Sequence, residues 1–100
     1  MTAVKPTAIT EKDWMRQVVD LARIRHWDIY HTHISRWSEA GWPDLSLVRP
    51  PRLILAELKS ATGKLTAGQT HWLTQLQACP GVEVYLWRPD DLDHIAEVLR

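Results

Sequence analysis

The sequence predicts a single α/β domain with a mixed four-stranded sheet and the element order α-β-β-β-α-β-α. Three observations lead to this prediction. Two stretches begin with capping residues, Thr10 and Thr66, and continue with apolar residues at helical spacing. Four runs of apolar residues have the length and composition of strands. The dipeptides Pro50-Pro51 and Pro80-Gly81 interrupt the chain between such runs.

One hundred residues are enough for one small domain, which we assign to residues 10–100. We expect residues 1–9, which include Pro6, to form a loose leader. The first helix then begins with Thr10 as N-cap and Asp13 at the third helical position. Its core face is marked by an apolar stripe of Trp14, Val18, Leu21 and Ala22. The helix is expected to end near His26, because a histidine tolerates the left-handed conformation.

The second predicted helix runs from Thr66 to about Ala78, and Gln69 completes a capping box at its start. The last helix follows Arg88-Pro89, with Asp90 as its expected N-cap. Its apolar stripe consists of Leu92, Ile95, Ala96 and Leu99.

The first strand is expected over residues 27–34 and the last over residues 82–87. Between them, the apolar runs 41–48 and 53–59 flank the doubled proline, which indicates two strands joined by a tight connection. Both faces of the run 53–59 begin with apolar residues. This strand is therefore expected to be central and covered on both sides.

Glu57 and Lys59 lie on one face of that central strand, beyond the apolar Leu53 and Leu55. Burying such charged groups is costly unless each has a partner. If the two strands pair antiparallel, Asp44 supplies a second carboxylate at the same end of the sheet. Mg²⁺ binds one or two carboxylates together with waters and substrate phosphate, and a neighbouring lysine can orient the water or hold the phosphate. The alternative is an exposed Glu57–Lys59 ion pair, contributing about 0–1 kcal/mol.

The arrangement Pro43-Asp44 followed after a dozen residues by Glu57-Leu58-Lys59 resembles the PD-(D/E)XK nuclease signature. The surrounding blocks narrow the resemblance to the VRR-NUC (virus-type replication–repair nuclease) branch of that superfamily. They are Gly41 to Leu45, Leu55 to Ser60, Gly63-Lys64-Leu65-Thr66 with Gln69 and Trp72, and Val84 to Pro89. The resemblance covers nearly the whole chain, from about Thr10 to Leu99.

This resemblance implies the restriction-endonuclease-like PD-(D/E)XK sandwich and a metal-dependent DNA endonuclease. Asp44 and Glu57 would ligate Mg²⁺ or Mn²⁺, with the Leu58 carbonyl as a further ligand. Lys59 would orient the attacking water, and Gln69 would support the carboxylates. In-line displacement would leave 5′-phosphate and 3′-hydroxyl ends. Family members of this size resemble Holliday-junction resolvases, which implies a homodimer acting on branched or structured DNA in DNA repair.

Glu11 matches an acidic residue that adds a metal or water contact in the family. Its alternative role is that of a first-turn glutamate facing the helix dipole. Gln69 has pure capping as its alternative, and Gln17 is a weaker candidate for facing the site. Two departures from the family pattern concern local backbone only. His26 replaces a glycine at the helix end, and Ala67-Gly68 replaces Pro-Glu after the second cap.

Three further residues are candidates for contacts with DNA. Arg36 and Lys64 can bind phosphates, and Trp37 can stack on a base. Each has an equally ordinary role as a solvated or locally packed side chain. His31 and His33 share one strand face, but no second pair at ligand spacing completes a zinc site, so surface or substrate-facing histidines are expected.

Composition sets limits on the class of protein. Twelve basic and twelve acidic residues give no overall basicity, so composition alone does not indicate nucleic acid. With no signal peptide, no membrane span and one cysteine, we expect a cytoplasmic protein of a bacterial or phage-infected host cell. Two rival functions are a non-cleaving DNA-binding module that recruits or regulates a replication or repair enzyme, and an interaction domain that uses the six tryptophans. The intact set of Asp44, Glu57 and Lys59 counts against the first. Most of the tryptophans fall at predicted core positions, which counts against the second.

Overall fold

The doubled proline closes a hairpin at the centre of the fold. In the computed structural model, which describes residues 9–33 and 39–100, β2 (Leu45–Arg49) and β3 (Arg52–Leu58) pair antiparallel on either side of it. Arg49 lies opposite Arg52 next to the turn, and Leu45 lies opposite Ala56 at the far end. The strands therefore meet the condition, left open by the sequence, under which Asp44 reaches the same end of the sheet as Glu57.

The hairpin is extended on both sides into a mixed sheet with the strand order β1-β2-β3-β4. β1 (Asp28–His31) pairs antiparallel with β2, and β4 (Glu83–Trp87) pairs parallel with β3. β3 is therefore an inner strand, and its residues 54–58 are all buried. The predicted α/β class, the mixed four-stranded sheet and the element order are confirmed.

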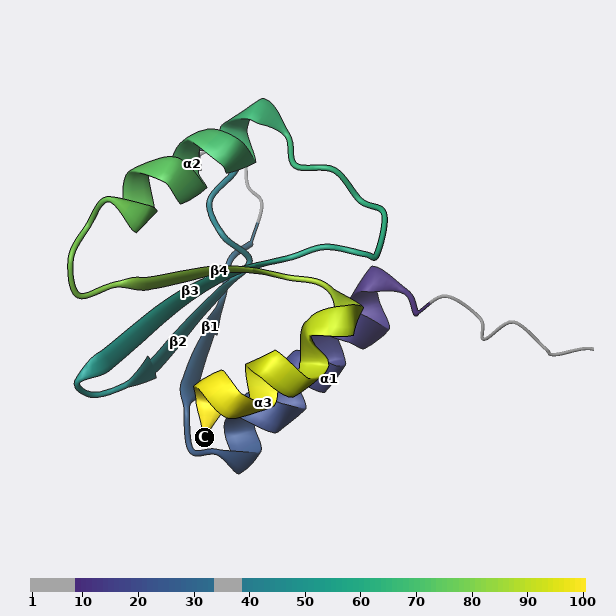
Figure 1. Ribbon diagram of the computed structural model, residues 1–100, viewed down its shortest axis with the longest axis vertical. Coiled ribbons are helices and arrows are strands. Elements are labelled where there is room, and N and C mark those ends of the chain that lie inside the picture. The colour runs from purple at the N-terminus through teal and green to yellow at the C-terminus, as the bar shows by residue number, and fades with distance from the viewer. Residues whose placement is uncertain (1–8, 34–38) are drawn as a thin grey trace, which may run out of the picture.

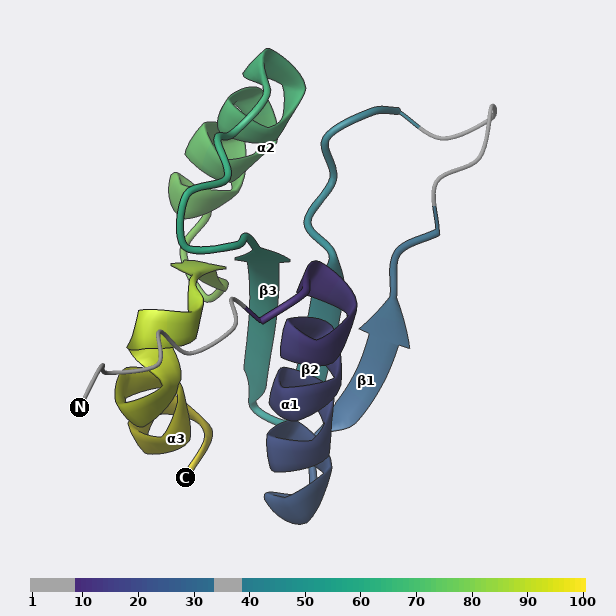
Figure 2. The ribbon, with the colours of Figure 1, turned by 90° about the vertical axis from the view of Figure 1, so that its right-hand side faces the viewer.

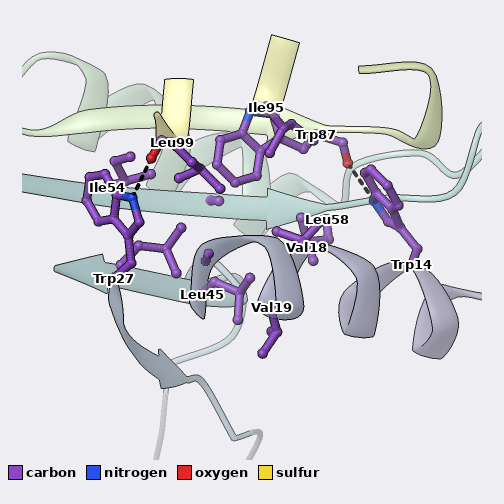
Figure 3. Close-up of a cluster of buried hydrophobic side chains, with 13 residues drawn as sticks. Trp14, Val18, Val19, Trp27, Leu45, Ile54, Leu58, Trp87, Ile95 and Leu99 are labelled. Carbon is purple, nitrogen blue, oxygen red and sulfur yellow. Dashed lines mark hydrogen bonds between the residues drawn. The ribbon is translucent and has the colours of Figure 1, made fainter. Parts of the chain in front are cut away.

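Two helices cover one face of the sheet. α1 (Glu11–Ile24) and α3 (Leu92–Leu99) lie side by side there, whereas α2 (Ala67–Gln77) lies on the opposite side (Figures 1 and 2). Side chains of α1 and α3 pack with β2, β3 and β4 in the main core (Figure 3). Its fully buried members include Trp14, Val18, Ala22, Leu45, Leu47, Ile54, Ala56, Trp87, Ile95 and Leu99. None of the helices in the described part of the chain is long and apolar enough to cross a membrane.

The predicted helix signals are largely confirmed. The Thr10 hydroxyl accepts a hydrogen bond from the Asp13 amide at 3.1 Å, and α1 ends before His26, which has a φ of 66°. At the start of α2, Thr66 and Gln69 form both bonds of the expected capping box. These caps satisfy amide groups that have no partner inside the helix.

Three predicted boundaries are wrong. The second strand begins at Leu45 rather than at residue 41. The first strand covers Asp28–His31, because the Trp27 amide donates to the Ala22 carbonyl at the end of α1 and residues 32–33 are not in a strand. Residue 34, the predicted end of this strand, lies outside the described residues. Asp90 does not cap the last helix. Pro89 instead begins a 3₁₀ turn, η1 (Pro89–Asp91), in which the Asp91 carboxylate accepts a hydrogen bond from the Arg88 amide at 2.8 Å.

Buried tryptophans bridge the helices and the sheet through their indole N–H groups. Trp14 Nε1 donates to the Trp87 carbonyl at 3.3 Å, and Trp27 Nε1 donates to the Leu99 carbonyl at 3.0 Å (Figure 3). The guanidinium group of Arg49 lies over the Trp27 ring, 4.4 Å from its centroid. Arg49 also donates to the carbonyls of Arg25, Leu99 and Arg100 at 2.9–3.1 Å. One arginine thus joins the hairpin to the ends of α1 and α3.

We expect Arg49→Ala to lower the free energy of unfolding by about 2 kcal/mol, because the ends of two helices lose a charged donor and Trp27 loses a cation–π contact. Urea denaturation measures this difference. Arg16→Ala, an exposed arginine of α1, is the matched control and should change stability by less than about 0.5 kcal/mol. Equal effects of the two substitutions would contradict the role of Arg49.

Candidate active site

Glu57 is the one charged residue among the buried residues described, at 1% exposure. The alternation of β3 places it with Leu55 on the face toward α2, while Ile54, Ala56 and Leu58 face the main core. Its Oε1 atom accepts a hydrogen bond from Gln69 Nε2 at 3.5 Å. Its Oε2 atom is buried and, when Glu57 is ionised, has no hydrogen-bond donor among residues 9–33 and 39–100. A buried oxygen without a partner is unfavourable unless a ligand completes it.

Asp44 reaches the same end of the sheet from the neighbouring strand. It directly precedes β2, and the antiparallel register brings it to the carboxyl end of β3. Its Oδ2 atom accepts a hydrogen bond from the Leu58 amide at 2.8 Å. Its own carbonyl accepts from the Thr32 amide at 2.9 Å, which fixes the backbone on the other side. The structure therefore brings Asp44 and Glu57 together.

The two carboxyl groups perturb one another. The pKa of Glu57 is raised to about 9, first by burial and then by the hydrogen bond and the charge of the adjacent Asp44 carboxyl, against the opposing effect of Lys59. Glu57 is therefore protonated at neutral pH while no cation is near. A cation placed between the two carboxylates would remove the repulsion and favour both ionised forms.

Lys59 follows β3 directly and is half-buried. Its amide donates to the Trp87 carbonyl at 3.0 Å, so the backbone at this position is fixed against the end of β4. The salt bridges among the described residues join Arg52 to Glu83 and Arg100 to Glu97. An ion pair between Glu57 and Lys59, the alternative considered from the sequence, is not formed in this part of the chain.

Gln69 serves both roles that were considered for it. Its Oε1 atom accepts a hydrogen bond from the Thr66 amide at 2.9 Å as part of the capping box. Its Nε2 atom points to Glu57. The same side chain therefore holds the start of α2 and the carboxyl group of the central strand.

A close backbone contact positions α2 for this interaction. A Cβ atom on Gly41 would lie 2.3 Å from the Gly68 carbonyl carbon and 2.6 Å from the Gln69 amide nitrogen. Gly41 also has a φ of 99°, which favours glycine. Of the Ala67-Gly68 pair, a poor helix start by propensity, this contact explains the glycine. A Cβ atom on Gly68 would lie 3.0 Å from the Ala40 carbonyl oxygen.

The residues present suit a hard divalent cation. Glu57 Oε2 and the Asp44 carboxylate offer oxygen donors at the same strand end. No cluster of three or more acidic, histidine or cysteine side chains at metal spacing occurs within the described ranges. Mg²⁺ retains several waters and is commonly held by one or two carboxylates, so two acidic side chains are sufficient.

The structure places the other residues predicted for the site in several parts of the chain. Glu11 is exposed in the first turn of α1, and its charge slightly raises the Glu57 pKa. Gln17 instead lines a groove between α1 and α3. Lys64 is exposed in the segment between β3 and α2. The predicted DNA contacts of Arg36 and Trp37 lie outside the described residues.

Sequence reasoning missed a pocket with a volume of about 380 Å³, which is lined in part by Trp42, two residues before Asp44. Its lining residues come from β1, the two residues that follow it, the segment before β2, and α2. They are Tyr30, Thr32, His33, Glu39, Trp42 and Trp72. The presence of Trp42 and Trp72 in the family-like blocks is a signal in the sequence, but the contribution of β1 depends on the sheet register.

Among solved structures, the fold is similar to that of a protein described as a "VRR_NUC domain protein". The TM-score is 0.68 and the sequence identity is 17%, over 93% of this chain and 87% of that chain. No protein-family model and no curated protein sequence matches the chain. The resemblance inferred from the motifs is confirmed at the level of the fold, because this mixed sheet with its helices has the architecture of a VRR_NUC domain protein.

The raised pKa of Glu57 predicts a pH dependence of stability for the metal-free protein. The folded state keeps a proton that the unfolded state loses near its ordinary pKa of 4.5. Stability from this group is therefore present at low pH and is lost as pH rises from about 5 to 9, by up to about 1.4 kcal/mol per pH unit. Glu57→Gln should become progressively more stable than the wild type over this range, as measured by urea denaturation in EDTA. Glu97→Gln, on the surface, is the control, and a pH-independent difference for Glu57→Gln would contradict the interpretation.

The Gly41 contact predicts a large cost for a single methyl group. Gly41→Ala should destabilise the protein by at least about 2 kcal/mol more than Gly81→Ala, because the new Cβ meets backbone atoms of α2. Gly81 is a matched control, since its φ is also positive, at 84°, but nothing lies within 4 Å of an added Cβ. Thermal and urea unfolding measure both costs. Equal destabilisation would show that backbone strain alone limits Gly41.

Proposed function

We propose that the protein is a metal-dependent DNA endonuclease that hydrolyses phosphodiester bonds. The observation that carries this proposal is the buried Glu57 carboxyl group, in which one oxygen has no hydrogen-bond donor. Asp44 lies at the same strand end, and Lys59 follows two residues later in the chain. The similarity of the fold to that of a VRR_NUC domain protein supports it. Asp44 and Glu57 are also the residues to which the PD-(D/E)XK motif resemblance assigns the metal.

Asp44 and Glu57 would hold Mg²⁺ or Mn²⁺, with the Leu58 carbonyl as a further ligand. The bound cation would neutralise charge on the scissile phosphate and acidify water. Lys59, beside Glu57, would orient the attacking water and contribute a positive charge near the developing negative charge. Gln69 would hold Glu57 Oε1 so that Oε2 remains available. Glu11 is a candidate for an additional water contact.

We propose branched or structured DNA as the substrate and a homodimer as the active form, as in Holliday-junction resolvases. The support for both is the motif resemblance in a chain of this size. A dimer would set two sites at a fixed separation, which suits paired cuts in two strands. Lys64, which is exposed near the start of α2, would contact a phosphate of the DNA whether the active form is a monomer or a dimer.

The decisive experiment incubates labelled linear, flapped and four-way DNAs with the protein in Mg²⁺, Mn²⁺ or EDTA. We expect metal-dependent cutting that Asp44→Asn, Glu57→Gln and Lys59→Ala each reduce by about 10²-fold or more, because each removes a group that acts on the reacting phosphate. Lys12→Ala, an exposed lysine of α1, should cut like the wild type. Circular dichroism verifies the fold of each variant.

Cleavage that survives in EDTA, or in folded Lys59→Ala, would show that this strand end is not the catalytic site. Failure of the wild type to cut any DNA, combined with tight binding, would favour the non-cleaving DNA-binding module.

A further inference from the structure

An aromatic pocket lies on the sheet face that also carries Glu57. Tyr30 pairs with Ser46, which pairs with Leu55, so these three residues share the face toward α2. Tyr30 is 66% exposed and Trp42 is 37% exposed, although both carry large aromatic rings. Trp42 meets Trp72 of α2 edge to face, with ring centroids 5.1 Å apart. The aromatic side chains of the pocket therefore come from three separate segments.

The pocket is joined to the acidic pair through the backbone on two sides. Trp42 is separated from Asp44 only by Pro43, whose carbonyl accepts a hydrogen bond from the Thr32 hydroxyl at 2.6 Å. Trp72 lies one helical turn after Gln69, which contacts Glu57. β1 and β3 are separated by two strand spacings, about 10 Å. A strand of DNA whose phosphate lies at the acidic pair would therefore have neighbouring nucleotides at this pocket.

The chemistry of the pocket selects a base rather than a phosphate. Aromatic rings stack on the flat faces of any nucleobase. Glu39 at the lining would repel a phosphate, but its carboxylate accepts hydrogen bonds from ring and amino N–H groups of bases. The volume of about 380 Å³ is in the range of pockets that hold small planar ligands. A base within an intact duplex is stacked on both faces, so only an unpaired base can enter.

We propose that the pocket formed by Tyr30, Trp42 and Trp72 binds an unpaired nucleobase next to the phosphate that is cut. This inference rests on the proposed nuclease function and specifies its substrate: DNA with an unpaired nucleotide beside the scissile bond. The pocket acts as a binding subsite, and it takes no part in the chemical step.

The test uses three DNAs: a duplex with one unpaired nucleotide, the same duplex with an abasic residue there, and a fully paired duplex. Fluorescence anisotropy with the Lys59→Ala protein measures binding without cleavage, and the unmodified protein measures cutting rates. Tyr30→Ala should weaken binding of the unpaired-base DNA by about fivefold or more and leave the other two DNAs within about twofold. Tyr30→Phe keeps the ring and should restore binding, and Trp42→Leu should act in the same direction as Tyr30→Ala.

Val48→Ala is the control, because Val48 is 38% exposed on the same sheet face but lies outside the pocket. Equal binding of the base-containing and abasic DNAs, or equal effects of Tyr30→Ala on all three, overturns the pocket inference. If the unmodified protein cuts none of the DNAs with any metal ion, the nuclease proposal is overturned instead. The anisotropy measurements then still show whether the pocket binds an unpaired base. Tyr30 is exposed, so its substitution tests the pocket even if Trp42→Leu fails to fold.

Discussion

The burial of the Glu57 carboxyl group beside Asp44 is the constraint around which this small fold is built. A central strand covered on both faces offers little room for a charged group. The carboxyl group is 1% exposed, and burial and the neighbouring acid raise its pKa to about 9. A protein that needed only stability would place an apolar residue there. The cost is explained if the two carboxyl groups are held to bind a cation, as proposed above.

The rest of the architecture can be understood as the means of holding this pair. Pro50-Pro51 sets the antiparallel register that brings Asp44 to the end of β3. The close approach of Gly41 and Gly68 brings α2 down on this end of the sheet, and the capping box fixes Gln69 above Glu57. On the other face, Trp14 and Trp27 bond to distant carbonyls and leave the sheet a rigid support. Rigid elements hold catalytic groups more accurately than loops do.

Much of this was predictable because the responsible signals are local. The caps at Thr10 and Thr66, the helical stripe of α1, and the doubled proline each act within a few residues, and the structure confirms them. Asp44 and Glu57 were predictable as neighbours once antiparallel pairing was assumed. The Gly41–Gly68 contact and the aromatic pocket were not, because each joins segments whose relation depends on the docking of α2. The start of α3 was missed because Pro89 favours a 3₁₀ turn before the helix.

The charge balance gives the aromatic pocket its significance. With a formal net charge of zero, the chain lacks the basic surplus through which many DNA-binding proteins obtain affinity from phosphates alone. Phosphate contacts are also independent of whether a base is paired. Stacking of an unpaired base on Tyr30 and the tryptophans would supply affinity that depends on DNA structure and is insensitive to net charge. If both proposals hold, a protein of zero net charge with a cation site next to an aromatic subsite would discriminate irregular DNA from the far larger amount of duplex.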